Sequence, residues 1–175
     1  MPARYSAGSE KNGPQLQRLL DISPRRDEAV LLLERENARL LRLCAQMEAM
    51  ADRLPAAFKA KRTLRLLQLT ELSLKRHTAI QEQIIFPTIR ERAGRQIDRL
   101  LKQCEYEHAS DGGLLIEILE RAINPGHSSD RTRVEAFGCL LRHFFEGKRR
   151  HLEWEKQALE PFMKQPRANS GNQEK

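Results

Sequence analysis

Apolar residues recur at intervals of three and four through most of this chain of 175 residues, which is the period of amphipathic α-helices. The first long helix is predicted to begin after Ser23, a suitable N-cap, with Pro24 at its first position. Pro87 is predicted to kink or end the second helix. The pattern predicts four long helices, at about residues 24–54, 57–86, 95–123 and 132–163.

Four long helices joined by short links predict an all-α fold, an up-down-up-down four-helix bundle. A short helical piece, "PQLQRLL", is expected to pack across one end of it. The bundle is expected to span residues 14–164, between disordered segments at 1–13 and 165–175 that are polar and hold Pro or Gly. The tandem Gly112 and Gly113 cost roughly 1 kcal/mol each relative to alanine, so close approach of a neighbouring helix or a local bend is expected there.

Composition supports helices over strands, because 39% of residues are hydrophobic and 31% charged but only 5% aromatic. The net charge of +7 raises the question of nucleic-acid binding. Basic and acidic residues are mixed in almost every segment, however, and only "GKRRH" at 147–151 is locally dense; its "GKRR" part is interpreted as a solvated face. Since no binding motif accompanies the charge, nucleic acid is not an expected partner.

The three cysteines, Cys44, Cys104 and Cys139, lie in helical apolar patterns without CxxC spacing, which predicts buried free thiols in a reducing compartment. No segment has the apolar length of a signal peptide or a membrane span. A soluble, cytoplasmic protein that does not bind membranes is therefore expected.

Three histidines occupy comparable places on three predicted helices: His77, His108 and His151. In a bundle, inward side chains from facing helices at one level are the usual way to enclose a metal ion. Glu155 follows His151 by four residues, about 40° around the helix, so both side chains can reach one ion. The segment "HTAIQEQIIFP" repeats the frame of "HLEWEKQALEP", with proline ten residues after the histidine, but has Gln81 where the other has Glu155.

Both segments resemble the signature of the hemerythrin-like, or HHE cation-binding, family. The resemblance spans roughly residues 25–163 and includes "LLERENARLLRL" on the first helix and "YEHASDGGLL" on the third. It implies a bundle that binds a non-haem di-iron centre and carries oxygen or handles iron, oxygen or nitric oxide. Carried over residue by residue, it implies that the metal ligands are His77, His108, His151 and Glu155.

Two positions depart from the family pattern, Asn37 where the first helix has a histidine and Gln81 where the second has a glutamate. Glu36 and Glu82 are the candidates to replace them. Glu82 lies about 140° from His77 on an ideal helix, so it can join only if the helix is distorted before Pro87 or rotated. Three histidines and one carboxylate are enough for one ion, and suit Fe(II), Zn(II) or another borderline divalent metal.

The resulting hypothesis is an iron-binding protein with one or two ions and a reduced site, in oxygen, nitric-oxide or iron sensing or stress response, with a small diatomic molecule as ligand. Enzymatic activity is not expected, because no nucleophile–base constellation or nucleotide-binding loop is present. The alternative is a metal-free helical module whose interior histidines and amides bond to one another. Such a module would use an exposed apolar stripe to bind a protein partner or form a homodimer.

Overall fold

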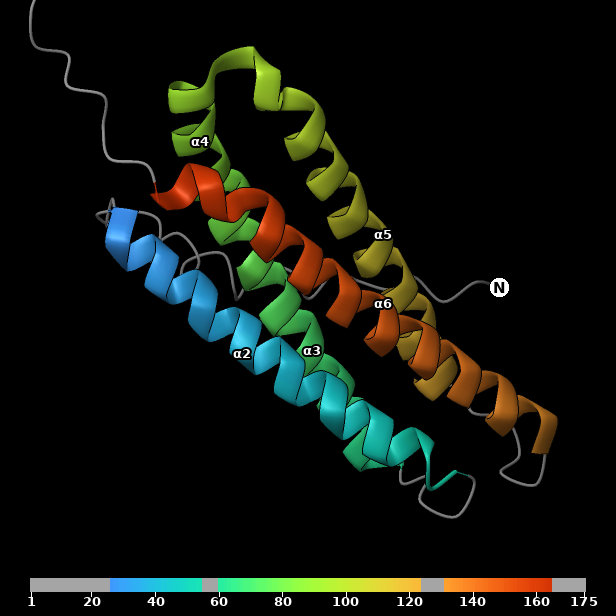
Figure 1. The fold of residues 1–175 in the computed structure, drawn as a ribbon. Helices are drawn as coiled ribbons and strands as arrows, with labels where there is room; N and C mark the ends of the chain where they lie inside the picture. Colours follow the sequence, from blue (N-terminus) through green and yellow to red (C-terminus); the bar gives the residue numbers. More distant parts are fainter. Residues whose placement is uncertain (1–25, 55–59, 124–130, 165–175) are drawn as a thin grey trace, which may run out of the picture.

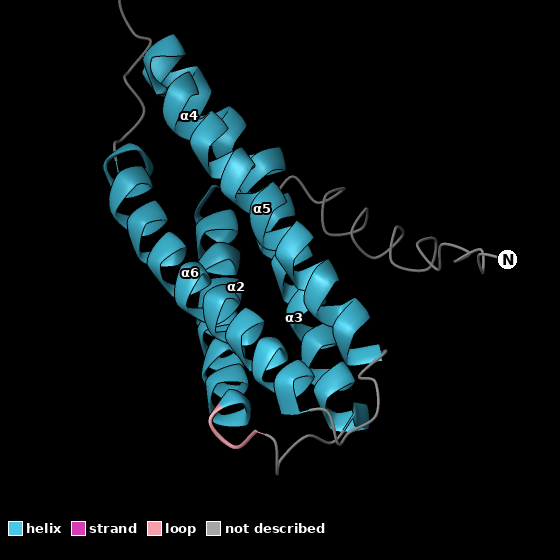
Figure 2. Cartoon of the chain, turned by 90° about the vertical axis from the view of Figure 1, so that its right-hand side faces the viewer, coloured by secondary structure: helices cyan, strands magenta, loops and turns pink. Residues whose placement is uncertain are grey.

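The computed structural model describes residues 26–54, 60–123 and 131–164 (Figure 1). These residues form helices and turns and contain no strand, which confirms the all-α class (Figure 2). The helices are α2 (Arg26–Ala51), α3 (Ala60–Ile80), α4 (Phe86–Ala93), α5 (Asp98–Ile123) and α6 (Arg131–Lys164). The predicted N-terminal helical piece and both predicted disordered segments lie outside the described residues.

The four-helix bundle predicted from the periodicity is confirmed. Helix α2 packs against α3 and α6, and α5 packs against the same two helices. Helices α2 and α5 therefore stand at opposite corners of the bundle, and successive long helices run in opposite directions (Figure 1).

Two buried apolar clusters fill the bundle of described residues, one toward each end. On α2, Ala29 and Leu33 belong to one cluster, and the residues from Leu40 onward belong to the other. The same division occurs on the other long helices, and buried polar side chains stand between the clusters: His77 and Gln81, His108, and His151 and Glu155. The polar layer is therefore enclosed above and below by hydrophobic packing.

The second predicted helix continues past Pro87 instead of ending there. A π-helical turn, Gln81–Ile85, joins α3 to α4, and the N–H of Phe86 bonds to the carbonyl of Gln81, five residues earlier. Proline has no N–H and its ring crowds the carbonyl four residues before it, so a wider turn directly ahead of Pro87 relieves the clash. Helix α4 ends at Gly94, whose φ of 66° favours glycine, and a 3₁₀ turn, Gly94–Ile97, leads into α5.

Two expectations about individual residues are wrong, and one of two alternatives is excluded. A Cβ added at Gly112 or Gly113 meets no atom within 4 Å, which excludes close approach of a neighbouring helix and leaves the local bend as an expectation. Cys44 and Cys104 are buried as expected, but Cys139 is exposed. Lys148, assigned to a solvated basic run, is fully buried.

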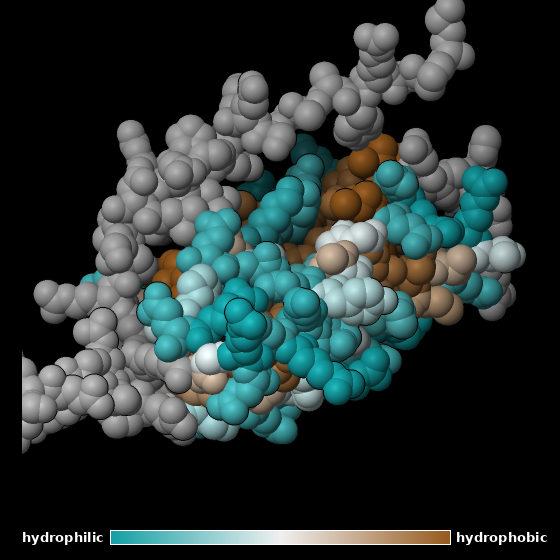
Figure 3. Space-filling view, turned by 90° about the horizontal axis from the view of Figure 1, so that it is seen from above, coloured by the Kyte–Doolittle hydropathy of each residue, from teal (hydrophilic) through white to brown (hydrophobic). Residues whose placement is uncertain are grey.

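The surface described here is mainly hydrophilic, with apolar side chains gathered toward one edge of the view in Figure 3. Large exposed apolar residues occur on three helices: Leu31, Leu41, Tyr106, Ile116, Ile123 and Trp154. None of the described helices has the length and apolar character needed to cross a bilayer.

Candidate metal centre

The structure brings all four predicted site residues together in the buried polar layer. His77 comes from α3, His108 from α5, and His151 and Glu155 from α6. Each offers one potential ligand atom, and these atoms lie within 4.8 Å of one another. All four residues are buried, the most exposed being His151 at 6%.

The carboxylate of Glu155 lies at the centre of the cluster, and all three imidazoles face it through Nε2. The distances from its oxygens are 3.3 Å to His77, 3.1 Å to His108 and 3.4 Å to His151. The rings of His77 and His151 each meet the ring of His108 edge-on, with centroids 5.3 and 5.6 Å apart. Packing of the rings therefore limits how far each Nε2 can turn away.

The outer nitrogens of two rings are held by polar groups on other helices. Asn37 Oδ1 lies 2.7 Å from His77 Nδ1, and Glu82 Oε1 lies 2.8 Å from His108 Nδ1. Both oxygens can only accept a hydrogen bond, so each Nδ1 carries the proton. In a neutral ring this tautomer directs the Nε2 lone pair into the cluster, as a metal-ligating histidine requires.

His77 and Glu155 show why the cluster suits a cation. Burial is the main reason that the pKa of His77 falls to about 4, and electrostatic interaction with Lys148 and His108 lowers it further. Glu155 raises this pKa but by less. His77 is therefore neutral at pH 7, and its Nε2 carries a lone pair. That atom lies 3.3 Å from Glu155 Oε2, and both atoms lack a hydrogen-bond partner. Two buried acceptors that face each other need either a proton or a metal ion between them, and with the His77 proton on Nδ1 the position suits a metal ion.

Glu155 is the anionic member of the cluster. Burial alone raises the pKa of Glu155, but the three imidazoles around its oxygens, His108 first and then His151 and His77, outweigh this and hold the pKa far below its usual range. A divalent ion needs ionised carboxylates and unprotonated imidazole nitrogens, and it displaces any Nε2 proton on binding. Nε2 of His151 is also buried without a hydrogen-bond partner, so it is a further potential metal-ligand atom. The residues present fit a bound metal ion.

The two glutamates proposed as substitutes lie outside this four-residue cluster. The π-helical turn supplies the distortion that Glu82 requires, yet its carboxylate contacts the outer nitrogen of His108 and not the interior of the site. Glu36 accepts a hydrogen bond from Ser73 at 2.7 Å and lies 3.9 Å from a guanidinium nitrogen of Arg76. Glu82 therefore contacts the cluster from outside, and Glu36 contacts Ser73 and Arg76 instead.

A buried ion pair adjoins the cluster, which the sequence analysis missed. Lys148 Nζ lies 3.0 Å from Asp111 Oδ2. Lys148 precedes His151 by three residues on α6, and Asp111 follows His108 by three on the antiparallel α5, which puts the pair one turn away. The available signal was the stripe Phe144, Lys148, Glu155, whose spacings of four and seven share one helix face.

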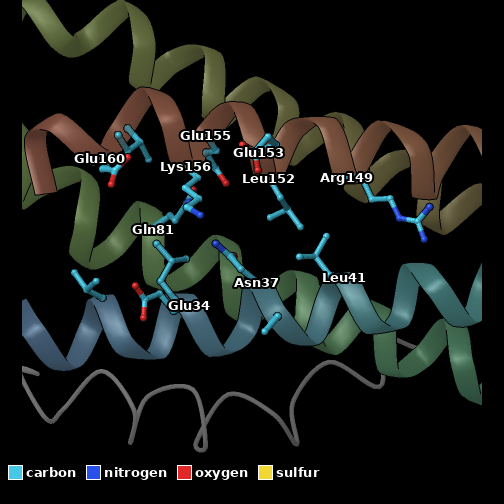
Figure 4. Close-up of a pocket in the computed structure, with 14 residues that line it drawn as sticks. Glu34, Asn37, Leu41, Gln81, Arg149, Leu152, Glu153, Glu155, Lys156 and Glu160 are labelled. Atoms are coloured by element: carbon cyan, nitrogen blue, oxygen red, sulfur yellow. The ribbon is translucent and has the colours of Figure 1, made fainter.

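A cavity of about 420 Å³ leads to the cluster between α2 and α6 (Figure 4). Asn37, Gln81 and Glu155 point into it from three helices, and aliphatic side chains such as Leu33 and Leu152 line its walls. Gln81 is 1% exposed, and its Oε1 has no hydrogen-bond partner. The two positions that depart from the family pattern therefore line the approach to Glu155.

Comparison with known proteins agrees with this geometry. Residues 29–163 match the model of a family described as the hemerythrin HHE cation binding domain. No curated protein and no solved structure matches the chain. The matched stretch is most of the chain and includes every residue of the cluster. The chain therefore belongs to the hemerythrin HHE cation-binding family.

Proposed function

We propose that this protein binds one divalent ion, iron, through His77, His108, His151 and Glu155, and that it senses or handles oxygen, nitric oxide or iron. The facing lone pairs of His77 Nε2 and Glu155 Oε2 carry the proposal, because they leave room for a cation and for little else. Two tetrahedral ligands each about 2.1 Å from an ion are roughly 3.4 Å apart. The nitrogen–oxygen distances of 3.1 to 3.4 Å therefore need little adjustment.

The cavity supports a sensing role over a purely structural metal site. Four protein ligands complete a tetrahedral ion, so a small molecule would have to bind as a fifth ligand, and it would need a route to the ion. Here the approach reaches Glu155, and its lining combines aliphatic residues with charged ones (Glu34, Arg149, Glu153, Lys156 and Glu160). The aliphatic part suits a small neutral molecule such as dioxygen or nitric oxide. Bound iron would supply reversible electron exchange with such a molecule. The amides of Asn37 and Gln81 line the approach and can hydrogen-bond the incoming molecule.

Metal content of the purified protein tests this proposal. Protein prepared without chelator or affinity metal is compared with a His151→Ala/Glu155→Ala variant. A matched control, His143→Ala/Glu146→Ala, removes the same residue types from exposed positions of α6. Elemental analysis should find about one ion, mainly iron, in the wild type and the control but none in the cluster variant. The same ion content in the cluster variant, with helical content unchanged by circular dichroism, would refute the ligand assignment.

A further inference from the structure

Lys148 is a charged group in an unusual place. Its side chain is fully buried, and its one carboxylate neighbour at ion-pair distance among the described residues is Asp111, 13% exposed. A buried ammonium is expensive unless a nearby charge offsets it. A single ion pair between α5 and α6 could serve packing alone, but this one adjoins a metal cluster and its charge acts on His77.

Counting the formal charges in and around the polar layer shows what Lys148 changes. Glu155, Glu82 and Asp111 contribute three negative charges, and Lys148 contributes one positive charge. Glu36 adds none, because Arg76 offsets it. With neutral histidines these four groups carry a net charge of two negative units, and the other charged residues that line the cavity (Glu34, Arg149, Glu153, Lys156 and Glu160) are outside this sum. One divalent ion neutralises that net charge, whereas a second would leave two uncompensated positive charges in an interior shielded from water.

Gln81, the residue beside Glu155 in the cavity, also disfavours a second ion. Gln81 lines the cavity beside Glu155 and offers an uncharged amide oxygen that has no partner. A hard or borderline divalent ion bound there would gain a ligand atom but no negative charge. Lys148 and Gln81 therefore disfavour a second ion in the same direction, one by adding a positive charge and the other by withholding a negative one.

We infer that the buried Lys148–Asp111 pair makes this centre a site for one ion, because the ammonium supplies the positive charge that a second ion would otherwise supply. This inference rests on the metal site proposed above. Lys148 lies two turns from Glu155, about 10.5 Å along the axis at 1.5 Å per residue. If the charge separation is taken to be about this axial rise, with an effective dielectric constant of about 20, removing the ammonium should strengthen binding of a second divalent ion by about two orders of magnitude.

Zinc titration of four proteins tests the inference, with Zn²⁺ as a probe that does not change oxidation state. They are the wild type, Gln81→Glu, Gln81→Glu/Lys148→Gln and Gln81→Glu/Lys148→Arg. Glutamine removes the charge but can still donate to Asp111, and arginine keeps the charge. We expect two ions in the glutamine double variant and one ion in each of the other three, by calorimetry and by elemental analysis after desalting.

The outcomes separate this inference from the proposed function. Two ions in the wild type, or one ion in the glutamine double variant, would overturn the role of Lys148 and leave the four assigned ligands standing; two ions in the wild type would also correct the proposed stoichiometry. No ion in the wild type would remove the proposed function and this inference with it. If circular dichroism shows that Gln81→Glu/Lys148→Gln does not fold, Gln81→Glu/Lys148→Met replaces it. Two ions in the wild type would overturn the inference in either case.

Discussion

Glu82 should tune metal affinity although it lies behind the metal site. Its carboxylate accepts the Nδ1–H of His108 at 2.8 Å and so fixes the tautomer that directs Nε2 inward. Glu82→Gln keeps an oxygen that can accept this hydrogen bond and removes only the charge. The substitution therefore measures the electrostatic part of the support that Glu82 gives to His108.

The size of the effect follows from the geometry and the exposure of the pair. A hydrogen bond to a charged group contributes about 1.5–3 kcal/mol and a neutral one about 0.5–1.5 kcal/mol. The side chain of Glu82 is 36% exposed, so solvent screens its charge. The charged hydrogen bond to His108 should therefore be stronger than the neutral one by only about 1 kcal/mol. At about 1.4 kcal/mol per factor of ten, Glu82→Gln should weaken metal binding about five-fold. Glu82→Ala, which removes the acceptor, should weaken it about ten-fold.

Competition between the protein and a chromophoric chelator for Zn²⁺ at pH 7 measures these dissociation constants. Glu91→Gln is the control, because it removes an exposed carboxylate from the adjoining α4. Its affinity should equal that of the wild type. An affinity of Glu82→Ala within two-fold of the wild type, or a larger loss for glutamine than for alanine, would refute the argument.

Three further predictions concern stability and reactivity. Metal at about 100 times its Kd should stabilise the folded protein by about 2.7 kcal/mol. Removing that metal with a chelator should therefore lower the melting temperature by about 5–10 °C in scanning calorimetry. An unchanged melting temperature would contradict metal binding to the folded state. Phe144→Ala should cost about 3–5 kcal/mol in urea unfolding, because the ring is 1% exposed, whereas exposed Trp154→Ala should cost far less. Burial raises the pKa of Cys44 to about 11 and of Cys104 to about 12, so a maleimide at pH 8 should label exposed Cys139 alone until the protein is unfolded.

Much of the fold could be predicted from the sequence because helix period and helix boundaries are local properties. The spacing of apolar residues and Pro55 placed the first helix within a few residues of its observed span, Arg26–Ala51. The four cluster residues could also be predicted. His151 and Glu155, four residues apart, share one helix face, and His77 and His108 match positions of the family pattern. The spacing of apolar residues along the chain does not determine how far apart the helices that carry them lie.

The surroundings of the cluster could not be predicted because they depend on packing between helices. Asn37 was interpreted as a missing ligand, but it lies opposite the outer nitrogen of His77. Lys148 looked like part of a solvated run, and the rotation of α6 against α5 decides that it points inward. The contact between Glu82 and His108 depends on the π-helical turn, whose position reflects both Pro87 and the packing of α4.

The π-helical turn also determines where this chain can change length. Each π-type hydrogen bond spans one residue more than an α-helical bond, so the turn Gln81–Ile85 accommodates one residue beyond what a regular helix would need. Deleting one exposed residue there, such as Gln83, would return the segment to an α-helical repeat and keep the buried faces of α3 and α4 in register. A deletion elsewhere in α3 would rotate every following residue by about 100° and turn half of a buried face outward. Relatives that differ by one residue in this helix should therefore differ at this turn.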